Sequence, residues 1–104
     1  MKRKEMIKMF DIVHEKESHR VIAKKDTQVL ATLIYELTDN NIVILHTILE
    51  NEADEDYARD LILLVVDYAR RNNYKVIPAS PLAAKVFKKD ADLLADVRAV
   101  IEEK

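Results

Sequence analysis

The sequence predicts an α/β fold, in which a mixed, mostly antiparallel sheet contains one β-α-β crossover. Three consecutive segments support this prediction: Ile42 to Leu49 reads as a strand that is apolar on both faces, Ala53 to Arg71 as a long helix, and Lys75 to Ser80 as a second strand. Two strands joined through a helix of this length most simply lie parallel in one sheet. The crevice between the end of the first strand and the start of the helix is the usual place for an anionic ligand.

Length and composition limit the classes of protein to which the chain can belong. Its 104 residues, 49% hydrophobic and 35% charged, suit one domain spanning residues 1–104. A net charge of -2 disfavours a nucleic-acid binder, and the lack of cysteine excludes disulfides and thiol nucleophiles. The longest apolar run, Leu61 to Val66, is too short for a membrane span or signal peptide, so we expect a cytoplasmic protein.

Three antiparallel strands are predicted before the crossover. Phe10 to His14 fits a strand, although its apolar residues also have helical spacing, and Arg20 to Ala23 fits a second. The third, Val29 to Thr38, forms a hairpin with the strand that starts at Ile42. Its alternation predicts a buried face of Val29, Ala31, Leu33, Tyr35 and Leu37, with Leu30 and Ile34 among polar residues on the other face.

The chain contains no glycine, so other residues must form its turns. Asn and Asp tolerate the left-handed backbone conformation best after glycine. We therefore expect Asp39 to Asn41 to turn the hairpin and Asn72-Asn73 to end the long helix.

The helices are predicted from apolar stripes and capping residues. The long helix carries an apolar stripe that contains Tyr57, Leu61, Leu64, Val65 and Tyr68 and is widened by Ala58, Ile62 and Ala69. Ser80 followed by Pro81 is a typical helix start, with Ser as N-cap, and opens a helix from Pro81 to Lys89. A last helix, capped by Asp90, has its apolar side at Leu93, Leu94, Val97 and Ile101.

These segments together carry a family resemblance over roughly Val21 to Val97. The order is hairpin strands, His46-Thr47 near the end of a central strand, a long helix ending in Ala69-Arg70-Arg71-Asn72-Asn73, and then Lys75-Val76-Ile77-Pro78-Ala79-Ser80. This order resembles the small single-domain N-acetyltransferases of the GNAT superfamily. The resemblance implies a GNAT-like fold, acetyl-CoA as cofactor and an amine as acceptor.

The resemblance also implies roles for particular residues. His46 and Thr47, with the backbone near Ile48, correspond to the wall around the acyl group, and His46 to a candidate base. Ser80 stands where the family has a cysteine. Tyr57 and Arg59, near the start of the long helix, correspond to residues within reach of the cofactor.

The loop before the helix departs from the family pattern. The family has a glycine-rich loop whose amides hold the pyrophosphate, whereas this chain has no glycine and a run of carboxylates from Glu50 to Asp56. Carboxylates at a helix N-terminus satisfy its capping and dipole needs, and they repel a phosphate. The sequence therefore predicts weak or lost binding of acetyl-CoA.

Each candidate residue also has a structural interpretation. His46 could be a hydrogen-bonded core histidine, Ser80 an N-cap, and Tyr57 a core residue of the helix stripe. The acidic run could be a solvated cap or a weak cation site, and the dispersed His14 and His19 predict no metal site.

Three functions remain open from the sequence. The first is an acetyl-CoA-dependent N-acetyltransferase with an unidentified amine acceptor. The second is a GNAT-fold protein that has lost the cofactor and acts as a binding or assembly module for a protein partner. The third, a nucleic-acid binder that uses the basic head from Met1 to Lys4, is disfavoured by the net charge. The sequence does not give the oligomeric state.

Overall fold

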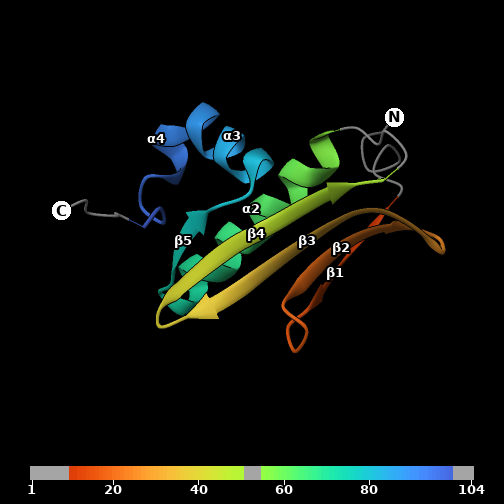
Figure 1. Cartoon of the computed structure of the whole chain (residues 1–104), viewed down its shortest axis with the longest axis horizontal. Helices are drawn as coiled ribbons and strands as arrows, with labels where there is room; N and C mark the ends of the chain where they lie inside the picture. The colour runs from red at the N-terminus through yellow and green to blue at the C-terminus, as the bar shows by residue number, and fades with distance from the viewer. Residues whose placement is uncertain (1–9, 51–54, 100–104) are drawn as a thin grey trace, which may run out of the picture.

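The computed structural model describes residues 10–50 and 55–99, which form a five-stranded sheet and three helices (Figure 1). The strands are β1 (Asp11–Glu15), β2 (Arg20–Lys25), β3 (Gln28–Thr38), β4 (Asn41–Leu49) and β5 (Lys75–Pro78). The helices are α2 (Glu55–Asn72), α3 (Pro81–Lys89) and α4 (Ala91–Leu94). Three predicted features lie outside the described residues: the basic head, the part of the acidic run from Asn51 to Asp54, and the side chain of Ile101.

The sheet has the predicted mixed topology. Its strand order is β1-β2-β3-β4-β5; the first four strands are antiparallel to their neighbours, and β4 pairs with β5 in parallel. Helix α2 connects β4 to β5 and passes behind the sheet in Figure 1. The predicted β-α-β crossover is therefore confirmed.

The core lies between one face of the sheet and helices α2 and α3. We call this the inner face of the sheet and the opposite one the outer face. Buried residues of α2 are Ala58, Leu61, Ile62, Val65, Val66 and Ala69. They pack against inner-face residues such as Leu33, Ile42 and Ile44, and against Phe87 of α3. Five residues of the predicted stripe are buried, whereas Tyr57, Leu64 and Tyr68 lie at the border of the core and are only partly buried.

A β-bulge between β2 and β3 changes which residues of β3 face the core. Between β2 and β3, Ala23 pairs with Ala31 but Lys24 with Val29, so Leu30 is an extra residue on β3. As a result Leu30 packs against the core, whereas Val29 is not part of it. The predicted faces of Val29 and Leu30 were therefore wrong, since simple alternation does not anticipate a bulge.

The turns confirm that glycine is replaced by residues that tolerate positive φ. Asp39 (φ 55°) turns the β3–β4 hairpin and Asp26 (φ 57°) the β2–β3 hairpin. At the end of α2, Asn73 (φ 60°) is followed by a hydrogen bond from the Tyr74 N–H to the Ala69 carbonyl, the six-residue bond of a Schellman cap. His19 (φ 57°) also adopts this conformation and stacks on the ring of Tyr35, 5.1 Å between centroids.

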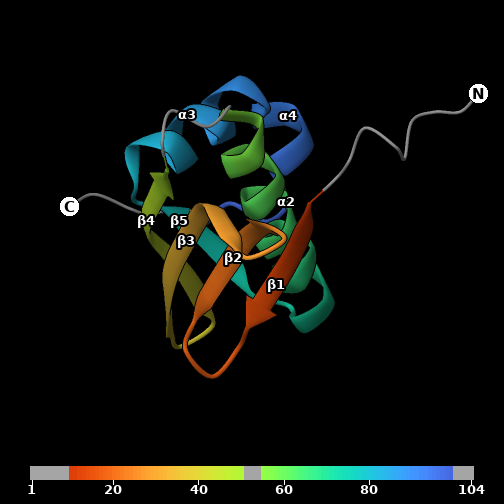
Figure 2. The same ribbon diagram turned by 90° about the vertical axis from the view of Figure 1, so that its right-hand side faces the viewer.

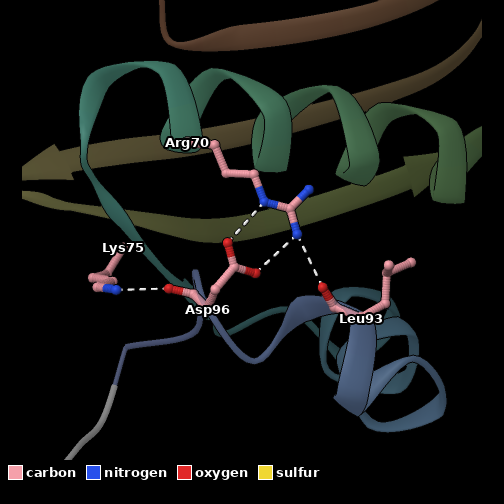
Figure 3. A network of polar contacts seen from close by, with 4 residues as sticks. All are labelled: Arg70, Lys75, Leu93 and Asp96. Atoms are coloured by element: carbon pink, nitrogen blue, oxygen red, sulfur yellow. Dashed lines mark hydrogen bonds and ion pairs between the residues drawn. The ribbon is translucent and has the colours of Figure 1, made fainter.

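The chain after α4 returns to the free edge of β5. The Val76 N–H donates to the Val97 carbonyl (2.7 Å), and the Ala99 N–H donates to the Val76 carbonyl (2.9 Å). Arg70 holds this segment against α2 through two hydrogen bonds to the Asp96 carboxylate (3.0 and 2.9 Å), while Lys75 donates to the Asp96 carbonyl (Figure 3). These contacts cover an edge that would otherwise be open to pairing with another strand.

No helix within residues 10–50 and 55–99 is long and apolar enough to cross a membrane.

The contact between His14 and Tyr35 at the border of the core predicts that the stability of the protein depends on pH. His14 Nε2 lies 2.7 Å from the hydroxyl of Tyr35, and the His14 ring packs against Tyr68. Burial, followed by the charges of Lys16 and His19, lowers the pKa of His14 below its usual 6.5. Burial also raises the pKa of Tyr35 to about 12, so this hydroxyl stays protonated.

We expect stability to fall as the pH is lowered from 7.5 to 5, because the unfolded chain binds a proton at His14 before the folded chain does. His14→Gln keeps an acceptor for Tyr35 but does not titrate, and should flatten the dependence of the melting temperature over this range. Thermal unfolding followed by circular dichroism measures the melting temperature of each protein at each pH. Equal slopes in the two proteins would contradict the assignment.

Candidate functional site

The candidate site lies where β4 and β5 separate. Their parallel pairing covers only Asn41–Ile44 and Lys75–Pro78. At its end the Ile44 carbonyl accepts from the N–H groups of both Ala79 (3.1 Å) and Ser80 (2.9 Å). Because β5 stops at Pro78, the predicted strand Lys75 to Ser80 was two residues too long. The rest of β4, from Leu45 to Leu49, continues without β5 beside it.

A turn at Pro78 causes the separation. The Ala79 N–H donates to the Ile77 carbonyl (3.0 Å) as well as to Ile44, which closes a three-residue γ-turn around Pro78. Ser80 follows as N-cap of α3, with Pro81 at the first helical position. The chain therefore leaves the sheet and enters a helix within three residues.

A bulge at Leu45 shifts the alternation of β4 by one residue, so that Thr47, and not His46, returns to the face of Ile44. Ile34 pairs with His46 but Tyr35 with Ile44, so Leu45 is the extra residue. Beyond the bulge, Thr47 pairs with the buried Leu33 and lies on the inner face. The hydrogen-bonding alternation of antiparallel strands directs the peptide groups of Thr47 and Leu49 toward the side that β5 has left.

Thr47 and Ser80 meet across the opening between the strands. Their hydroxyl oxygens lie 3.0 Å apart, and Ser80 Oγ also accepts from the Ala83 N–H (3.1 Å). The side chain of Ser80 is buried, with the residue 1% exposed. The predicted N-cap is thus confirmed, and among the described residues no basic group contacts this hydroxyl.

His46 and Ile48 lie on the other face of the sheet. His46 pairs with Ile34 and Ile48 with Thr32, and both His46 and Ile48 are exposed. The interpretation of His46 as a core histidine was therefore wrong. The structure separates His46 from Ser80 by the thickness of the sheet, so the two predicted catalytic residues do not form a hydrogen-bonded pair.

The start of α2 faces α3 across a groove of about 80 Å³ that contains charges of both signs. Arg59 donates to the carboxylate of Asp90 at 3.0 Å, and Lys85 to that of Glu55 at 3.1 Å. Asp56 and Lys89 also line the groove. Of the three cations that line the groove, Arg59 and Lys85 have carboxylate partners, whereas Lys89 has none among the described residues.

Tyr57 points away from this groove. Its ring packs edge-on against Phe10, with centroids 4.9 Å apart. Of the predicted cofactor residues, Arg59 lies in the groove and Thr47 at the strand opening, whereas Ile48 and Tyr57 lie elsewhere. Lys85 and Asp90 were missed as partners, since only the packing of α3 on α2 brings them there.

The described residues contain no cluster of three or more His, Cys, Asp or Glu side chains that could hold a metal ion. Residues 51–54 of the acidic run are outside that search.

Comparison with known proteins identifies the class to which this fold and opening belong. The sequence profile of the GCN5-related N-acetyl-transferase family matches residues 20–97. The fold is similar to the solution structure of a GCN5-like protein from Staphylococcus aureus, provisionally described as an N-acetyltransferase, with 26% identity, a TM-score of 0.66, and coverage of 91% of this chain and 93% of that one. The chain belongs to the GCN5-related N-acetyltransferase (GNAT) family and has its α/β fold. A search of curated proteins finds no match.

The contacts of Ser80 predict a structural effect of its substitution. Ser80→Ala removes the acceptor of the Ala83 N–H and the partner of Thr47 and should lower stability by about 0.5 to 2 kcal/mol. Thr47→Val is the matched control, because it removes the hydrogen bond between the hydroxyls but leaves the cap in place; it should cost less. Denaturant unfolding measures both.

The same contacts predict that Ser80 forms no acyl-enzyme. Mass spectrometry of the intact protein after incubation with acetyl-CoA should show no added acetyl group at this residue. An acetylated Ser80 peptide would contradict the N-cap role as its main one.

Proposed function

We propose that this protein is a GNAT-fold protein in which binding of acetyl-CoA is weak or lost, and that it acts as a binding or assembly module. One observation carries the proposal: at the helix start that would face the pyrophosphate, three cations are matched by three carboxylates of the same chain, and two of these cations, Arg59 and Lys85, are held in ion pairs. A cofactor that carries several phosphate charges needs the opposite arrangement.

The charges of this region support the proposal. A helix N-terminus attracts anions through its free amides and dipole, which are worth about 0.3 to 1 kcal/mol per favourable charge. Here Glu55 and Asp56 occupy the first turn of α2 and already use this attraction. A phosphate that approached would also displace Asp90 from Arg59 and Glu55 from Lys85.

The chemistry at the opening agrees with this proposal. A serine hydroxyl is a poor nucleophile without an adjacent base, and Ser80 Oγ contacts only Thr47 and Ala83 among the described polar groups. The absence of cysteine removes the alternative nucleophile.

The second candidate function is an active N-acetyltransferase. It is favoured by the separation of β4 and β5, which leaves the peptide groups of Thr47 and Leu49 directed toward the opening. A linear acyl chain could bind along this strand edge as an added strand does. In that case the residues of the opening would orient the acyl group, an amine acceptor would approach it, and water would accept the amine proton, because His46 lies on the other face of the sheet.

A thermal-shift titration with acetyl-CoA separates the two. A ligand at 100 times its dissociation constant stabilises the native state by about 2.7 kcal/mol, which raises the melting temperature of a domain of this size by roughly 10 to 20 °C. We expect less than about 2 °C at millimolar acetyl-CoA. A saturable rise of the larger size, together with acetyl transfer to a polyamine, would overturn the proposal.

Removing the competing carboxylates tests the cause. Glu55→Gln combined with Asp90→Asn frees Lys85 and Arg59, and should produce a measurable shift with acetyl-CoA. Asp90 makes no side-chain cap to α4, so its replacement spares the helices. Asp11→Asn with Glu36→Gln makes the same change in net charge on exposed strand residues, and should leave the response to acetyl-CoA unchanged.

A further inference from the structure

The outer face of the sheet is apolar, although no described helix covers it. Antiparallel sheets with one face in water normally carry polar residues on that face. The pairing register instead places six aliphatic side chains there, from all five strands: Val13, Ile22, Ile34, Val43, Ile48 and Ile77. In Figures 1 and 2 the helices α2, α3 and α4 leave this face open.

The pairing aligns these side chains in adjacent rows. One row runs across four strands as Val13, Ile22, Thr32 and Ile48. A neighbouring row contains Ile34 and His46, and a third contains Val43 and Ile77. Val13 is 39% exposed and Ile48 is 43% exposed, whereas Ile22 in the same row is only 9% exposed, so the patch is open to a partner mainly at its ends. None of the six belongs to the core cluster or packs against it.

We propose that this outer face is the interface of a homodimer, in which two copies stack their sheets face to face around a two-fold axis. This inference goes beyond the proposed function, because it concerns the face opposite the Thr47–Ser80 opening and does not depend on whether acetyl-CoA binds.

Charge favours a second copy over a charged partner. The ionic side chains beside the apolar rows balance one another. Asp11 pairs with Lys24 and Glu15 with Arg20. Glu36, opposite Val43, shares the face with Lys75, two residues before Ile77, so three carboxylates balance three cations. Arg20 donates to the Glu15 carboxylate at 2.6 Å. A neutral, apolar patch attracts neither an acidic nor a basic partner and does not repel its own copy. In a two-fold interface the patch must complement itself in this way.

Shape favours the same occupant. Aligned sheets pack about 10 Å apart, with strands near −30° to each other, when their twists match. A second copy carries a sheet with the same twist. Five strands about 4.8 Å apart, with rows over about 15 Å of strand, present roughly 360 Å² on each copy, so a dimer buries about 700 Å², in the range of weak, transient contacts and below the roughly 1,200 Å² of stable interfaces. We therefore infer a weak, concentration-dependent dimer.

Sedimentation equilibrium of the full chain from about 1 µM to about 1 mM tests the proposal, because this range covers the affinities expected of a small interface. The weight-average mass should rise with concentration from monomer toward dimer. A mass that stays at the monomer value up to the highest concentration would overturn the proposal, as would growth beyond the dimer without a plateau.

A pair of variants assigns the interface. Ile48→Glu places two carboxylates in a two-fold contact and should weaken the dimer by at least about a hundredfold. Leu93→Glu makes the same exchange at an apolar side chain of α4 that is 59% exposed and lies off the outer face, and should associate like the wild type. Melting curves establish that both variants fold. A dimer retained by folded Ile48→Glu, or lost equally in Leu93→Glu, would contradict this interface.

Discussion

The carbonyl group of Ile44 marks the constraint on which the rest of the site depends. It accepts the N–H groups of Ala79 and Ser80, which are the last backbone hydrogen bonds between β4 and the chain that follows β5. The γ-turn around Pro78 bends the chain away from β4, so parallel pairing does not extend beyond it. The separation of the two strands and the position of α3 both follow from this point.

The bulge at Leu45 then decides which residues at the end of β4 face inward. Thr47 shares the inner face with Ser80, while His46 and Ile48 lie on the outer face. A histidine and a hydroxyl that look adjacent in the sequence pattern are therefore on opposite sides of the sheet. Their chemistry cannot be combined in the way that a nucleophile and its base require.

The sequence was sufficient to predict the topology but not the local geometry of the site. The crossover, the glycine-free turns at Asp39 and Asn73, and the Ser80 cap each depend on short-range chemistry, and all are confirmed. The bulges at Leu30 and Leu45 depend on how two strands pair, so the alternation of polar and apolar residues within one strand does not predict them. The partners of Arg59 and Lys85 depend on the packing of α3 against α2, and local sequence patterns do not predict this tertiary contact.

The proposed function therefore rests on two features of the structure. The opening between β4 and β5 is of the GNAT type, but the charges at the start of α2 are already balanced. The most direct test is an ¹H–¹⁵N NMR titration of the protein with acetyl-CoA, which reports the opening and the helix start separately. The account predicts no saturable shifts of the Arg59 and Lys85 amides at millimolar ligand. Saturable shifts of these amides together with those of Thr47 and Ser80 would show a complete cofactor site and contradict it.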